Sequence, residues 1–190
     1  MDLLPKTVTV DGEEYDIRSD FRAILDICVA LADPELEDNE KATVALCIFY
    51  PDAERLKTEQ IGEAIERCFW FINGGGEEEG ASSSPSPRLI DWEKDIHLII
   101  PPINRVLGTE IRALDYLHWW TFLGAYYEIG DCLFSQVVRI RDKLARNRKM
   151  DKSEREWYRR NRKMVDLPKK LTSQEQEFLD LWLGKGGSKA

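Results

Sequence analysis

Histidine is scarce in this sequence, and the motifs of common catalytic sites are missing. There are two histidines in 190 residues, no Gly-x-Ser-x-Gly nucleophile turn and no phosphate-binding Gly-x-x-x-x-Gly-Lys-[Ser/Thr] loop. His97 and His118 could join Asp91 and Asp95 around a metal ion, but residue 97 lies on a different side of a helix from residues 91 and 95. We therefore predict a protein without enzymatic activity, cofactor or metal.

Long apolar segments are absent as well. No stretch approaches the roughly 20 apolar residues that a membrane-spanning helix requires. The N-terminal MDLLPKTVTV lacks the basic start and the apolar stretch of a secretory signal. A charged fraction of 33% and a net charge of −8 indicate a soluble protein. We expect it in the cytoplasm and not at a membrane.

The cysteines form no recognisable site. Neighbouring cysteines are 19 or more residues apart and no Cys-x-x-Cys pair occurs, which fits neither a zinc site nor a disulfide-linked small domain. Free cysteine packs as a small apolar side chain. We expect buried, reduced thiols at Cys28, Cys47, Cys68 and Cys132.

Charge is distributed unevenly along the chain. Residues 1–100 contain 9 basic and 23 acidic residues, a net charge of −14, whereas residues 136–170 contain 14 and 5, a net charge of +9. The basic stretch could neutralise a nucleic-acid backbone, with Trp157 and Tyr158 stacking on bases. It could equally dock against the acidic front half or an acidic protein. The pI near 5.0 argues against a dedicated nucleic-acid-binding protein. We keep nucleic-acid binding as an alternative function. The basic side chains concerned are Arg139, Arg141, Lys143, Arg146, Arg148, Lys149, Arg159, Arg160, Arg162 and Lys163.

Hydrophobic spacing predicts a mainly α-helical bundle with a small N-terminal β-hairpin. Apolar and polar residues alternate around Asp11-Gly12, a pair suited to a tight turn, and predict a hairpin over residues 6–18. Apolar residues three and four positions apart then predict helices. We expect Ser19 or Asp20 to cap the first of them. The predicted helices of the front half span residues 21–32, 39–49 and 58–72.

A Gly/Ser-rich stretch separates two halves of the chain. Residues 74–87, GGGEEEGASSSPSP, have almost nothing to bury and are predicted to form a flexible loop. We divide the chain into an acidic half of residues 1–73, this loop, and an aromatic and basic helical half of residues 88–190. The two halves could also fold together as one domain.

The second half is predicted to be helical throughout. Its first helix begins near residue 87 and should be interrupted at Pro101-Pro102, because proline lacks the backbone N–H and clashes with the preceding turn. A capping-box pattern, Ser153 to Glu156, predicts the start of another helix. The further helices are predicted over residues 109–129, 132–149, 153–165 and from 172 to the glycine stop at 184.

The helix predicted over residues 109–129 carries unusual aromatic surface. Its segment LHWWTFLGAYYEI presents two neighbouring stripes, more than a single apolar face needs. We expect one stripe to lie in the core and the other either to join it or to bind a partner. The first stripe is Trp119, Phe122, Tyr126 and Ile129, and the second is Trp120, Leu123 and Tyr127.

Several of these elements together resemble a known family. The residues are Asp95 before an apolar helix, Leu-His-Trp-Trp-x-Phe at 117–122, Ile140-Arg141 and the basic helix with Trp157-Tyr158. They resemble the tail assembly chaperone-like proteins of long-tailed bacteriophages, which are encoded next to the tape measure gene. The resemblance covers most of residues 8–167, with a weaker match at YDIRSDFRAILDI near the start.

The resemblance implies a non-enzymatic protein of the host cell cytoplasm. It would bind the tape measure protein, keep it soluble and yield it to subunits of the major tail tube protein. A structural tail component retained in the virion is the alternative, and homo-oligomers are possible. The residues expected to contact a partner are Trp119, Trp120, Phe122, Tyr126, Tyr127, Arg139, Arg141, Arg146 and Trp157.

Overall fold

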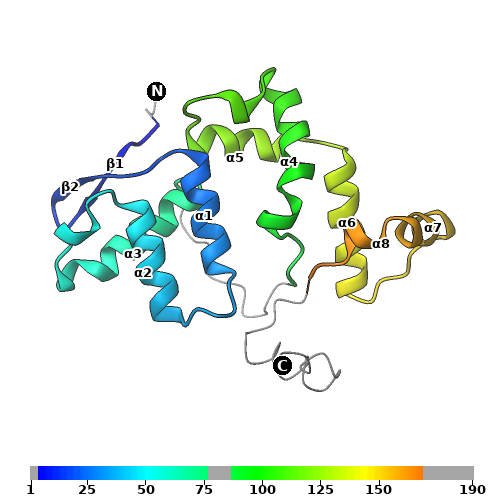
Figure 1. Ribbon diagram of the computed structural model, residues 1–190, viewed down its shortest axis with the longest axis horizontal. Coiled ribbons are helices and arrows are strands. Elements are labelled where there is room, and N and C mark those ends of the chain that lie inside the picture. Colours follow the sequence, from blue (N-terminus) through cyan, green and yellow to red (C-terminus); the bar gives the residue numbers. More distant parts are fainter. Residues whose placement is uncertain (1–3, 77–86, 169–190) are drawn as a thin grey trace, which may run out of the picture.

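A computed structural model describes residues 4–76 and 87–168, which form a mainly α-helical structure with one small β-hairpin (Figure 1). The predicted fold class is therefore confirmed. No helix in this part of the chain is both long and apolar enough to cross a membrane. The helix predicted from residue 172 lies outside the described residues, as does most of the predicted loop. The α-helices are α1 (Phe21–Leu31), α2 (Asp38–Phe49), α3 (Ile61–Ile72), α4 (Trp92–Leu107), α5 (Trp119–Tyr127), α6 (Leu133–Ala145), α7 (Lys152–Arg160) and α8 (Arg162–Val165).

The hairpin forms where the alternating pattern predicts it. Strands β1 (Thr7–Val10) and β2 (Glu13–Asp16) pair antiparallel, with Val8 opposite Tyr15. The turn residues Asp11 and Gly12 both have positive φ angles, 49° and 75°, as the tight two-residue hairpin turn requires. Val8 and Tyr15 are buried, so the apolar side of the hairpin faces the helices.

Helix α4 runs through both prolines, and the predicted interruption is wrong. Pro101 and Pro102 lie inside a helix that ends only at Leu107, with Gly108 in the left-handed conformation after it. Pro102 and its neighbour Ile103 are buried. Proline inside a helix costs roughly 3 kcal/mol, and the burial of this face offsets that cost and keeps the helix continuous.

A helix was predicted to begin at residue 109, but the chain there forms only a short 3-10 helix (Ile111–Ala113), and an extended stretch then leads into α5. The backbone N–H of Phe21 donates to the carbonyl of Leu117 (2.9 Å), and the N–H of Trp119 donates to the carbonyl of Ser19 (2.8 Å). These bonds tie the segment to the chain that leads into α1. Backbone groups engaged in this way cannot join a helix, so α5 begins only at Trp119.

Two side chains complete the junction between α1 and α5. Asp20 caps α1 by accepting from the N–H of Arg22 (3.0 Å), and its other carboxylate oxygen accepts from the N–H of Leu117 (2.9 Å). His118 caps α5, because its Nδ1 accepts from the N–H of Trp120 (3.0 Å). Since Nδ1 is an acceptor, Nε2 carries the proton and donates to the carbonyl of Pro5 (2.9 Å).

The basic helices differ from their predicted boundaries. Helix α6 ends at Ala145, and Asn147 then adopts a positive φ of 52° that turns the chain. Asp151, and not Ser153, caps α7: its carboxylate accepts from the N–H of Glu154 (2.8 Å) while the Glu154 carboxylate accepts from the N–H of Asp151 (2.9 Å). The predicted helix over residues 153–165 is two helices, α7 and α8.

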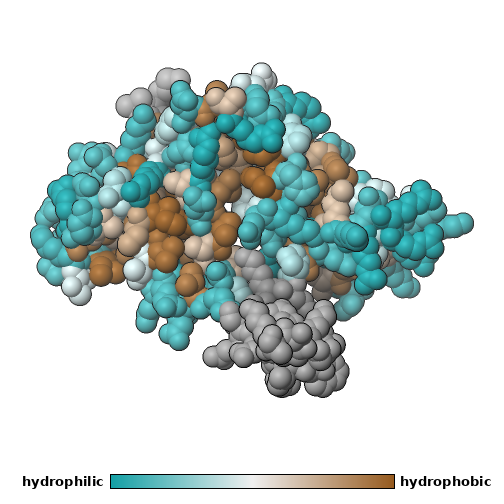
Figure 2. Space-filling model, in the orientation of Figure 1, coloured by the Kyte–Doolittle hydropathy of each residue, from teal (hydrophilic) through white to brown (hydrophobic). Residues whose placement is uncertain are grey.

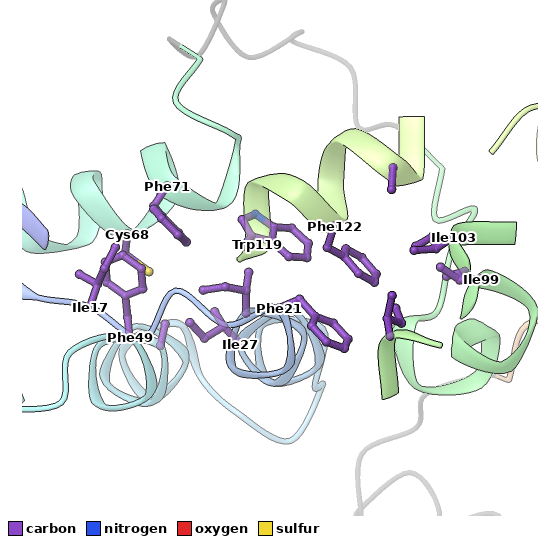
Figure 3. Close-up of a cluster of buried hydrophobic side chains, with 14 of the residues drawn as sticks. Ile17, Phe21, Ile27, Phe49, Cys68, Phe71, Ile99, Ile103, Trp119 and Phe122 are labelled. Atoms are coloured by element: carbon purple, nitrogen blue, oxygen red, sulfur yellow. The ribbon is translucent and has the colours of Figure 1, made fainter. Parts of the chain in front are cut away.

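Both halves of the chain contribute to one buried cluster (Figure 3). Phe21 of α1 stacks on Phe122 of α5, with ring centroids 4.9 Å apart. Trp119 is 2% exposed, and its indole Nε1 donates to the carbonyl of Ile72 at the end of α3 (2.8 Å). The core therefore connects α5 directly to the helices of the front half.

A buried ion pair joins the remaining helices to this core. Asp95 of α4 is fully buried and Arg141 of α6 is 4% exposed. The guanidinium binds the carboxylate through two hydrogen bonds of 2.5 and 2.9 Å. It also donates to the carbonyls of Leu89 (3.0 Å), Met164 (3.0 Å) and Val165 (2.6 Å). All five N–H groups of Arg141 are thus satisfied.

We predict that Asp95→Ala lowers the free energy of unfolding by about 3–5 kcal/mol, because it leaves a buried guanidinium without its counter-charge. Urea denaturation measures the loss. The matched control is Glu156→Ala, which removes an exposed pair with Arg160 within α7 and should change stability little. Equal losses in the two variants would contradict a special role for the buried pair.

Stability should also depend on pH through His118. Burial lowers the pKa of His118 below its ordinary value near 6.5, and the charge of Lys6 lowers that pKa further. Below about pH 6.5 the unfolded chain therefore binds a proton that the folded chain does not, and the free energy of unfolding falls. We expect the free energy of unfolding to change less between pH 7.5 and pH 5.5 in His118→Asn than in the wild type. Asparagine keeps a capping oxygen but does not titrate. Denaturation at both pH values measures the difference. Identical slopes would exclude His118 as the cause.

Candidate functional site

The first aromatic stripe of α5 lies in the core. Trp119, Phe122 and Ile129 are buried, at 2%, 0% and 7% exposure, and Tyr126 is half-buried. Burial raises the pKa of Tyr126 to about 12, so its hydroxyl stays neutral. In this conformation Trp119 and Phe122 have almost no exposed surface.

Most of the second stripe is also engaged inside the molecule. The indole Nε1 of Trp120 donates to the carbonyl of Phe71 (2.8 Å), and its ring stacks on the Phe71 ring at 5.7 Å. A Cβ on Gly75, whose φ is +82°, would lie only 2.7 Å from the Trp120 ring, so no larger residue fits there. Tyr127, 73% exposed, is the residue of this stripe that faces solvent.

The arginines expected to contact a partner do not lie together around these aromatic side chains. Trp120 packs on α3, while Arg141 is buried between α4, α6 and α8, and Arg146 pairs with Asp142 of its own helix (2.6 Å). Arg139 is exposed on α6 and Trp157 is half-buried on α7. Figure 1 places α3 and α6–α8 at opposite ends of the molecule.

Many basic side chains between Arg139 and Lys163 already have acidic partners within the protein. Six of the ten basic side chains considered for nucleic-acid binding form ion pairs within the described residues. The pairs are Arg141–Asp95, Lys143–Glu154, Arg146–Asp142, Arg148–Asp142, Arg160–Glu156 and Arg162–Asp166. These pairs occupy individual side chains but leave the net charge of +9 almost unchanged, because every acidic partner except Asp95 is already counted in it.

The candidate metal residues are dispersed. Asp91 caps α4 by accepting from the N–H of Lys94 (3.1 Å), Asp95 binds Arg141, and both ring nitrogens of His118 have partners. Both aspartates are buried. Within residues 4–76 and 87–168, no group of three potential ligands is close enough to hold a metal ion.

The cysteines give no reactive centre in the described chain. All four are free. Cys68 is buried and Cys28 half-buried, and burial raises their pKa values to about 12 and about 11, so both thiols are protonated and unreactive at neutral pH. Cys132 is half-buried, and Cys47 is exposed on α2, contrary to the expectation of burial.

The clearest binding surface is a groove between α1 and α4, which we name the α1/α4 groove. Its volume is about 510 Å³. Phe21 and Ile100 form a buried floor, whereas the apolar walls are only half-buried. Figure 2 shows apolar residues exposed on the face that α1 and α4 share, flanked by hydrophilic ones. The wall residues are Leu25 and Val29 of α1 and Trp92 and Ile96 of α4.

Charged side chains border the groove. Arg22 and Arg112 are already paired, with Asp20 and Glu110 respectively. Asp26 and Glu93 border it too, and neither forms an ion pair with a described residue. The apolar groove therefore has an acidic edge that is free to meet basic groups.

Aromatic contacts link the groove to the exposed end of α5. Trp92 in the groove wall lies 5.6 Å from the ring of Tyr126, and Tyr126 lies 5.9 Å from the ring of Tyr127. The sequence pattern drew attention to Tyr127 but missed the groove. The helical spacing of apolar residues around Leu25 and around Ile96 could have indicated an apolar face on each of the two helices. It could not have indicated that these two faces lie opposite each other.

Comparison with known proteins gives one match. No curated protein and no solved structure matches the chain. The model of the family described as "Bacteriophage Gp15 protein" matches residues 1–167, which include the hairpin, α1 to α8 and the groove. The chain therefore belongs to the bacteriophage Gp15 protein family, which indicates a protein of phage structure or morphogenesis.

Proposed function

We propose that this protein is a tail assembly chaperone that acts without catalysis in the host cell cytoplasm. It binds a helical segment of the tape measure protein in the α1/α4 groove and releases that segment to subunits of the major tail tube protein. The observation that carries the proposal is the groove itself, an apolar channel between two helices with charged edges. Such a channel suits the apolar stripe of an amphipathic helix.

The composition of the groove supports a helical client with basic flanks. Leu25, Val29 and Ile96 can cover the apolar stripe of the client, while Asp26 and Glu93 can meet lysine or arginine beside it. A tape measure protein exposes such stripes before the tube encloses it, and uncovered stripes aggregate. The net charge of −8 helps to keep the complex soluble.

The modest size of the groove suits release. One groove of about 510 Å³ covers only a short segment, so each contact is weak and exchanges readily. Many copies along one long client nevertheless hold it together through avidity. Tube subunits that polymerise around the client can then displace the copies one after another.

We predict that Leu25→Asp and Ile96→Asp each weaken binding of a tape-measure fragment at least tenfold. Burial of a leucine or isoleucine side chain contributes about 1.5–3 kcal/mol, and a tenfold change corresponds to about 1.4 kcal/mol. Titration calorimetry measures the affinity, and the soluble fraction of the co-expressed fragment measures chaperone action.

The matched control is Val106→Asp. Val106 is exposed and lies on α4 like Ile96, but it is outside the groove. It should bind like the wild type, and thermal unfolding must show that all three variants are folded. A fragment that aggregates equally with and without the wild-type protein would refute the chaperone function. Unchanged binding by folded Leu25→Asp and Ile96→Asp would refute the groove as its site.

A second pair of variants separates folding from binding on α5. Trp119→Ala should lower the free energy of unfolding by about 3–5 kcal/mol, because it empties a core position. Tyr127→Ala should leave stability nearly unchanged and weaken client binding severalfold, because Tyr127 extends the groove surface into solvent. If Tyr127→Ala binds normally, the client surface ends at Trp92.

A further inference from the structure

We infer that copies of this protein associate head to tail: a basic face on α7 and α8 of one copy docks on the acidic hairpin end of the next. Both surfaces carry charges that have no counter-charge within the described part of one molecule. The contact needs no client, so it is independent of the proposed function.

Helix α7 presents a basic face to solvent. Lys152, Arg155 and Arg159 lie three and four positions apart, and therefore within an arc of about 60° on the helix. Arg159 also borders a hollow that it shares with Lys163 of α8, so the face continues onto that helix. All four residues are exposed, and none of them pairs with an acidic side chain among the described residues. The face is therefore open to an acidic partner.

The hairpin end of the molecule carries the opposite charge. The described residues 4–76 include 16 acidic and 7 basic residues, a net charge of −9. Glu14 and Asp16 lie on the side of β2 that faces away from the buried Tyr15. They belong to a set of exposed acidic residues that form no ion pair within the described ranges. The set is Asp11, Glu14, Asp16, Glu54 and Glu59.

The basic face and the acidic end lie at opposite ends of the molecule (Figure 1). They cannot meet within one chain, but the basic face of one copy can meet the acidic end of another. Because the two surfaces differ, each such contact leaves one free surface of each kind, and the contact can repeat into a chain or close into a ring. Complementary charge also steers the copies toward this orientation as they approach.

A second copy fits the basic face better than nucleic acid does. Glu156, although paired with Arg160, lies among the cations of this face and would be brought close to phosphates. Trp157 and Tyr158, which could have stacked on bases, instead pack against the core. Stacking on aromatic side chains is a main source of affinity for single strands, and the basic face lacks it.

Sedimentation equilibrium of the full-length protein tests the contact. At about 25 mM salt we expect the average mass to exceed the 22.0 kDa of one chain and to rise with protein concentration. At about 500 mM salt the mass should return to that of one chain, because salt screens charges on separate molecules. Arg155→Gln/Arg159→Gln and Glu14→Gln/Asp16→Asn should each weaken association about tenfold, since one exposed ion pair contributes up to about fivefold.

A matched control and a mixing experiment establish which surfaces meet. Arg55→Gln/Lys57→Gln removes two positive charges as well, but from the acidic end, and should associate at least as well as the wild type. The basic-face variant keeps its acidic end, and the acidic-end variant keeps its basic face. Mixed together, they should form dimers through one intact contact and nothing larger.

Two results would overturn the inference. One is a wild-type protein that stays monomeric at low salt; if it then retains a duplex DNA that Arg155→Gln/Arg159→Gln does not, the basic face binds nucleic acid instead. The other is association that neither double variant weakens, or a mixture that assembles beyond dimers. No tape-measure fragment enters these measurements, so either result leaves the proposed function standing.

Discussion

The buried pair of Asp95 and Arg141 is the interaction on which the arrangement of the second half depends. Two charges taken out of water are tolerated only when every hydrogen bond is made, and Arg141 meets that condition through five acceptors on α4, α8 and the segment before α4. The pair also fixes the rotation of α4 about its axis. It thereby determines that Trp92 and Ile96 border the groove.

The other wall of the groove is positioned from the front half. Asp20 caps α1 and binds the backbone just before α5, while Phe21 stacks on Phe122. Helix α1 is therefore held by the same aromatic helix that contacts α4. The surface proposed to bind a client is not a property of either half of the chain, because it exists only where α1 and α4 meet.

Local patterns predicted the hairpin, most helices and that one of the two aromatic stripes lies in the core, but not which one. They failed where contacts between distant residues decide the outcome. The extended segment before α5 depends on bonds to Ser19 and Phe21, and the fate of Arg141 depends on a partner 46 residues away. A basic residue in a run of basic residues is expected to lie at the protein surface. Nothing in its neighbourhood reveals that it is the one taken into the interior.

The two prolines of α4 bear on what holds this helix together. Because Pro101 and Pro102 have no N–H, the carbonyls of His97 and Leu98 receive no hydrogen bond from the residue four positions later. The turn of α4 at His97 and Leu98 is therefore joined to the next turn by two fewer backbone hydrogen bonds than in an ordinary helix. At this point α4 is therefore held in place more by the packing of its buried side chains than by its own backbone hydrogen bonds.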